Sequence, residues 1–138
     1  FADALGFGTT AITLPSADGS ADQVLTTDGS GTLSFVDNTG GTSWVAIKTG
    51  AYTASAGEGV FVNTTSSAFA ITLPASPSLG DEVSIVDYAG TFDSNACTIG
   101  RNSQPIMGVA EDLVVSTERA SFTLVYVDGT QGWLFKGD

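Results

Sequence analysis

The chain has 138 residues and a net charge of −11, from 15 acidic residues against four basic ones. Its length suits one domain, or one domain with an appendage. Nucleic acids and anionic membranes bind clustered Lys and Arg, so we expect neither as a partner.

The first 37 residues indicate short strands without a core of their own. Residues 1–8 are apolar but show no usable periodicity. Asp28-Gly29 favours a tight hairpin, because glycine readily adopts the positive φ of such turns. The segment holds few large apolar residues, so it must pack on the rest of the chain or on copies of itself. Its expected strands are 9–14, 23–27 and 32–36.

Residues 38–43, Asn-Thr-Gly-Gly-Thr-Ser, are typical of a linker. We therefore expect a stalk- or collar-like β segment over 1–37, the linker, and a β-sandwich domain over 44–138. Turn residues recur there at the spacing of an all-β, antiparallel sandwich or barrel-like fold. The expected strands of this domain are 44–48, 52–54, 59–63, 68–73, 82–87, 96–99, 113–116, 121–127 and 132–136.

The densest apolar stretch spans residues 68–87, where one strand stops at Pro74 and a second follows a Pro/Ser/Gly loop. It predicts either a core hairpin or a strand–loop–strand pair that crosses between two sheets. Residues 121–127 are apolar on both faces and predict a central strand. We expect four side chains of the stretch to be buried: Ile71, Leu73, Val83 and Ile85.

The chemistry of common enzymes is missing from the sequence. Without His there is no Ser-His-Asp or Cys-His catalysis and no usual zinc ligand. Cys97 is the only cysteine, which predicts a buried small hydrophobe. Adjacent carboxylates such as Asp81-Glu82 point to opposite faces of a strand, although a dyad drawn from separate strands stays open. We expect no enzyme activity, catalytic residue, metal or cofactor.

Calcium is the open alternative to a metal-free chain. Asp93-Ser-Asn95 begins like an acidic calcium loop, but Thr98 replaces the required Gly and Gln104 the closing Glu. The simpler interpretation is that Asp93 and Asn95 make turn hydrogen bonds.

Aromatic residues are the remaining indication of binding. Rings beside Gly-rich turns can stack on sugars, or can serve core-edge packing and subunit contact. The second interpretation applies to Trp44 and Trp133, which stand at strand starts beside such turns. The candidates for sugar stacking are Trp44, Tyr88, Tyr126 and Trp133.

Two segments resemble a motif of bacteriophage tail fibres and related virion proteins. They are 14–19, Leu-Pro-Ser-Ala-Asp-Gly, and 23–35, Gln-Val-Leu-Thr-Thr-Asp-Gly-Ser-Gly-Thr-Leu-Ser-Phe. The motif usually has Gly before Gln23, where this chain has Asp22, and often has Trp where Phe35 stands. Residues 44–133 are similar to β-rich modules of cyanophage-type structural proteins, at 69–74, 77–87, 90–92, 99–102, 124–128 and 132–133.

The resemblance implies a homotrimeric, non-enzymatic tail fibre or spike protein of an extracellular virion, joined to other virion tail proteins. It also implies a β-domain, as shaft or knob, that contacts host cell-surface glycans. A carbohydrate-binding adhesin module of a bacterial surface protein is the alternative, and a polysaccharide-cleaving domain the third. The candidate surface-recognition residues are Arg101, Asn102, Gln104, Asp93 and Asn95, with turn formation as the alternative role.

Overall fold

The computed structural model describes residues 4–7, 10–21, 23–38 and 40–137. The chain divides into two compact units, Phe1–Gly40 and Gly41–Asp138, and the division falls inside the glycine-rich stretch 38–43. The described residues form strands and turns without a helix, which confirms the all-β class. No helix among them is therefore long and apolar enough to cross a membrane.

The described residues of the N-terminal unit form two antiparallel pairs of strands. Asp28 closes the second one, because its Oδ1 accepts the backbone N–H of Ser30 at 2.7 Å and of Thr32 at 3.0 Å. This turn confirms the expected hairpin. The first strand was not predicted, since its four residues show no alternation. The strands are β1 (Ala4–Phe7), β2 (Thr10–Thr13), β3 (Gln23–Thr27) and β4 (Leu33–Asp37).

This unit has no core among its described side chains. Between Ala11 and Asn38 none of the described residues is buried. In β3–β4, Leu25 faces Phe35 across the ladder, while Val24 faces Val36 on the opposite side. Cross-strand partners share a face, so both faces of the hairpin present apolar side chains to solvent.

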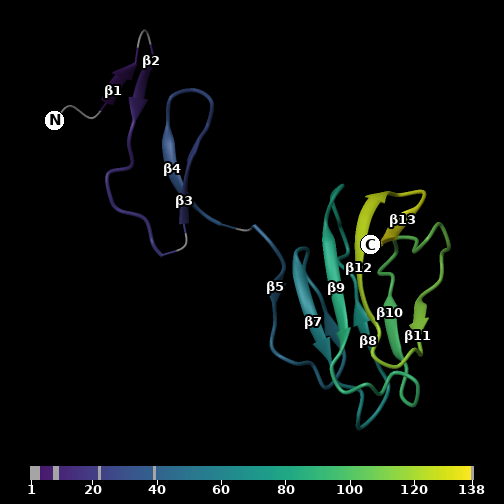
Figure 1. Ribbon diagram of the computed structural model, residues 1–138. Helices are drawn as coiled ribbons and strands as arrows, with labels where there is room; N and C mark the ends of the chain where they lie inside the picture. The colour runs from purple at the N-terminus through teal and green to yellow at the C-terminus, as the bar shows by residue number, and fades with distance from the viewer. Residues whose placement is uncertain (1–3, 8–9, 22, 39, 138) are drawn as a thin grey trace. The chain divides into compact units, whose positions relative to one another are not determined.

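The C-terminal unit is a sandwich of two sheets (Figure 1). The five-stranded sheet has the order β13-β12-β9-β7-β5, and the four-stranded sheet has the order β11-β10-β8-β6. The strands are β5 (Ser43–Trp44), β6 (Tyr52–Thr53), β7 (Glu58–Val62), β8 (Phe69–Thr72), β9 (Glu82–Asp87), β10 (Cys97–Gly100), β11 (Leu113–Val115), β12 (Ser121–Asp128) and β13 (Gly132–Lys136).

From β5 to β10 the chain winds around the sandwich. Strands β5, β7 and β9 pair parallel in one sheet, and β6, β8 and β10 pair parallel in the other. Parallel neighbours cannot be joined by a tight turn, so each connection carries the chain to the opposite sheet. Only the last strands add antiparallel neighbours, at β10–β11, β9–β12 and β12–β13.

The expectation of an antiparallel sandwich is therefore corrected to a mixed one. Alternating side chains reveal a strand but not the direction of its partner, which depends on where the chain crosses. The hairpin interpretation of residues 68–87 is also wrong, because β8 and β9 lie in different sheets. The other interpretation, a pair that crosses between sheets, is confirmed.

The core lies between the two sheets. Ile71, Leu73, Val83 and Ile85 are all fully buried, as predicted. Strand β12 lies inside its sheet between β13 and β9, which confirms its central position. The remaining core side chains are Ala54, Val60, Val62, Phe92, Cys97, Ile99, Ile106, Leu124, Tyr126 and Trp133.

Cys97 belongs to this core, and its thiol should be unreactive in the folded protein. Burial raises the pKa of Cys97 from 9.0 to about 11, and only the thiolate attacks thiol reagents. At mildly alkaline pH we expect an aromatic disulfide reagent to label Cys97 only as fast as the protein unfolds. Labelling in denaturant provides the rate for the free thiol. Equal rates with and without denaturant would contradict the buried position.

Candidate binding site

Asp93 and Asn95 lie in the turn that precedes β10. The side-chain amide of Asn95 donates to the carbonyl of Thr64 at 2.9 Å, which ties the turn to the end of β7. Asp93 is exposed and accepts the hydroxyl of Ser94 at 3.2 Å. Asn95 therefore stabilises the turn, while the Asp93 carboxylate faces solvent.

Arg101, Asn102 and Gln104 follow β10, and the structure turns two of their side chains toward the protein. The amide of Asn102 donates to the carbonyl of Leu73 at 2.8 Å, and Gln104 Oε1 accepts the hydroxyl of Tyr126 at 3.0 Å. Asn102 adopts a positive φ of 49°, a conformation that asparagine tolerates better than most residues. These bonds hold the loop in shape.

The structure does not bring the two predicted groups together. Asp93 and Asn95 precede β10 in the chain, whereas Arg101, Asn102 and Gln104 follow it. Four strand residues separate them, which corresponds to about 13 Å along the strand. Any recognition by these loops would therefore use two separate places on the surface.

Carboxylates in the described residues serve mainly as acceptors in turns. Asp81 accepts the N–H of Ser78, Glu58 that of Ser55 and Asp112 that of Arg101. Hydrogen bonds from two turn N–H groups lower the pKa of Asp128 below its ordinary range. No cluster of three or more His, Cys, Asp or Glu that could hold a metal occurs in the described part of the chain.

One buried carboxylate, Asp87 at the end of β9, organises two loops. Its Oδ1 accepts the N–H of Gly90 at 2.9 Å and of Thr91 at 3.2 Å, and its Oδ2 those of Phe92 at 3.2 Å and Arg119 at 3.0 Å. Burial raises the pKa of Asp87, but these four donors outweigh it and hold the pKa below its ordinary value. The carboxylate is thus a structural anchor.

The outer face of the five-stranded sheet is hollowed. A row of residues that are partners across the strands runs from β5 at one edge to β13 at the other. Small side chains occupy its middle and long ones its ends. Neighbouring strands lie about 4.8 Å apart, so the two ends are separated by about 19 Å. The row reads Trp44, Gly59, Ser84, Thr123 and Lys136.

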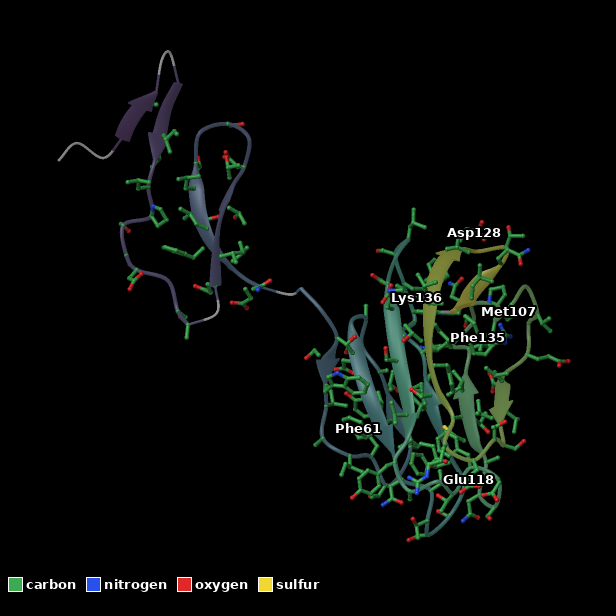
Figure 2. All side chains as sticks on the ribbon, in the orientation of Figure 1. Phe61, Met107, Glu118, Asp128, Phe135 and Lys136 are labelled. Carbon is green, nitrogen blue, oxygen red and sulfur yellow. The ribbon has the colours of Figure 1, made fainter. Side chains whose placement is uncertain are left out.

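A depression of about 460 Å³ lies on this row, and we call it the outer trough. It falls within the size range of small-molecule sites. Lys136, labelled in Figure 2, lies at the β13 side, whereas Trp44 lies at the β5 side. Six of the lining residues are Thr42, Trp44, Ser84, Val86, Thr123 and Lys136.

The ring of Trp44 is held in place although half of the residue is exposed. It stacks on Phe61 of β7, labelled in Figure 2, with ring centroids 4.6 Å apart and planes at 24°. It also lies against Gly59, where a Cβ atom would come within 2.5 Å of the indole. Glycine at this position is what allows the ring to lie against the sheet.

The floor of the trough is polar but neutral. The hydroxyls of Ser84 and Thr123 are hydrogen-bonded to each other at 2.8 Å. At the β13 end, Lys136 pairs with Glu82 at 2.8 Å, so that this end carries no net charge. The trough therefore offers an aromatic ring, hydroxyls and a neutralised ion pair.

Sequence reasoning named Trp44 as a sugar-stacking candidate but missed its companions. Gly59, Ser84 and Thr123 are 25 and 39 residues apart in sequence and meet only because β7, β9 and β12 are adjacent. The available signal was the presence of small residues at outward positions of otherwise β-branched strands. Trp133, its counterpart in the sequence prediction, is fully buried.

Comparison with models of known protein families and with curated proteins finds no match for this chain.

Proposed function

We propose that this chain is a structural subunit of a virion appendage, a tail fibre or spike, that assembles as a homotrimer and displays the C-terminal sandwich at its surface. In this proposal the N-terminal hairpins associate between copies. The sandwich is the displayed module and contacts the host surface. The chain carries out no reaction.

The observation that carries the proposal is the contrast between the two units. The sandwich encloses its own core of fully buried side chains, whereas the described side chains of the N-terminal unit enclose none. An isolated two-stranded hairpin is at best marginally stable in water. The apolar residues on both faces of β3–β4 need packing partners to be buried, and copies of the same chain would supply them symmetrically.

The non-enzymatic part of the proposal rests on how the polar residues are used. The sequence has no His, and most of the carboxylates described above accept backbone N–H groups or form an ion pair. These roles fit a scaffold that must stay rigid outside a cell.

Light scattering of the full chain in solution tests the assembly. Three copies of a 14.0-kDa chain should give a particle of about 42 kDa. Leu25→Asp is expected to convert it to monomers, because Leu25 is 50% exposed on β3 and a carboxylate there would be buried among apolar partners.

Leu79→Asp is the matched control. Leu79 is even more exposed, at 78%, but lies in the loop before β9 of the sandwich, so the trimer should persist. A wild-type chain that remains a 14.0-kDa monomer would contradict the proposal. So would equal dissociation of the two variants.

A further inference from the structure

We propose that the outer trough is a binding site for an uncharged oligosaccharide, which stacks on Trp44 and hydrogen-bonds to the hydroxyl floor. The proposal deepens the proposed function, because it assigns host-surface contact to a defined place on the sandwich. It also moves that contact away from the loops that flank β10.

The Trp44 ring is held in position before any ligand binds. Phe61 covers one side of the Trp44 indole and Gly59 lies beneath it, yet Trp44 remains 49% exposed and lines the trough. An aromatic side chain that is fixed before binding loses little conformational freedom on contact. Pyranose rings carry C–H groups on their faces, which pack against an indole in the same way as other apolar groups.

The floor of the trough can hydrogen-bond to a sugar. Beside the ring the sheet presents the hydroxyls of Ser84 and Thr123, whose mutual hydrogen bond leaves further acceptor capacity on both oxygens. A sugar has hydroxyl groups along its edge that can donate to these oxygens. The combination of an apolar platform and convergent polar groups is what small-molecule sites usually offer.

The charge of the chain favours an uncharged sugar over an anionic one. The chain carries −11 overall, and the one cation in the trough is paired with Glu82. An anionic glycan would meet a repulsive field without a free positive partner. A neutral oligosaccharide meets no such repulsion, and its hydroxyl groups can hydrogen-bond to the Lys136–Glu82 ion pair.

A second copy of the chain is the competing occupant, and the lining of the floor disfavours it. The floor presents the hydroxyls of Ser84 and Thr123, whereas sheets that pack face to face interdigitate apolar side chains. The exposed apolar side chains of β3–β4 offer a surface for self-association outside the trough.

Binding can be measured on the full chain with a panel of neutral trisaccharides of glucose, galactose and N-acetylglucosamine, extended to an array of neutral glycans. Trigalacturonate serves as the anionic comparator. Calorimetry provides affinities for all variants. Tryptophan emission reports on Trp44 directly, because Trp133 is fully buried. We expect saturable binding of a neutral member, with a shift in emission, and none of trigalacturonate.

Three variants locate the site. Trp44→Ala should weaken binding by about tenfold or more, the effect typical of removing one stacked aromatic side chain. Gly59→Ala keeps every lining residue but displaces the ring, since its Cβ would lie 2.5 Å from the indole, so affinity should also fall. Tyr88→Ala removes an aromatic residue of the same 49% exposure outside the trough lining and should leave affinity unchanged.

Each other outcome overturns the proposal. Absence of binding across the neutral panel and array would exclude the oligosaccharide. Binding that survives Trp44→Ala and Gly59→Ala would place the sugar elsewhere, and binding of trigalacturonate alone would reverse the argument from charge. Loss of assembly in Trp44→Ala would make the trough a contact between copies. Light scattering on the same samples separates the proposals, because a monomer that binds sugar contradicts only the trimer.

Discussion

Asp87→Asn is expected to destabilise the sandwich by about 3 kcal/mol, because it disrupts a buried carboxylate that accepts four backbone N–H groups. The side-chain NH₂ of the new asparagine is itself a donor, and it would face at least two of those backbone N–H groups without accepting from them. Asp87 is only 3% exposed, so water cannot replace the lost bonds. Equilibrium unfolding in denaturant measures the effect.

The control is Asp93→Asn, six residues further along in the same loop region. Asp93 is exposed and accepts only the hydroxyl of its neighbour Ser94 among the described residues. The free energy of unfolding of the Asp93→Asn variant should therefore differ from that of the wild type by less than about 0.5 kcal/mol. If the two variants were equally stable, the anchor at Asp87 would contribute nothing.

The pH dependence of Asp87→Asn follows from the lowered pKa of the wild-type carboxyl. A group whose pKa is lower in the folded than in the unfolded chain contributes its full stability above the unfolded value, close to 3.8 here. That contribution disappears as pH falls through the folded pKa. The difference in stability between wild type and variant should therefore be constant near neutrality and shrink in acid below the unfolded value.

Gly132→Ala is expected to cost about 4 kcal/mol or more, enough to leave much of the chain unfolded. Gly132 has a φ of +69° at the bulge between β12 and β13, where a side chain is strained. A Cβ atom would come within 1.8 Å of the Pro105 carbonyl oxygen. To relieve this, the loop must move and break the bond from the Trp133 N–H to that oxygen.

Gly129→Ala is the control in the same turn. A Cβ atom there meets nothing within 4 Å, and Gly129 is not among the glycines with positive φ, so stability should change by less than about 0.5 kcal/mol. Thermal and denaturant unfolding of both variants provide the comparison. If Gly132→Ala were as stable as Gly129→Ala, the loop at Pro105 would move aside without a loss of stability, and the prediction would be wrong.

Hairpins were the part of the fold that the sequence predicted best. Asp28-Gly29 and Asp128-Gly129 each stand between alternating strands, and both pairs fold back antiparallel. The information is local there, because an Asp side chain accepts the turn N–H groups in both turns. A glycine adopts the positive φ in each, Gly29 in the first turn and Gly132 at the end of the second. Strand β1 was missed because Gly6 interrupts its four residues.

Strand partners were the part that could not be predicted. The pairing of β7 with β9 and of β8 with β10 depends on the chain crossing the core between them. Nothing in the alternation of Val60 or Ile71 specifies which distant strand lies alongside. Local periodicity reports which face is buried, and topology is decided by packing across the whole unit.

The candidate site was foreseen only in part for the same reason. Trp44 was recognisable as an aromatic residue beside glycines, but its exposure depends on Gly59 in another strand. Asp87 looked like the end of a strand. The glycine three residues later was the local signal for its Asx-type turn, while the donor from Arg119 comes from a distant loop.

The winding from β5 to β10 has a consequence for how such units behave when crowded together. The first two strands of this winding, β5 and β6, each form one edge of a sheet. Both are only two residues long. At the other side, β11 has three residues and β13 ends in Lys136. Short edges and a lysine leave little backbone for a neighbour to extend. Sandwiches held close together in an assembly would therefore stay separate bodies and would not fuse edge to edge.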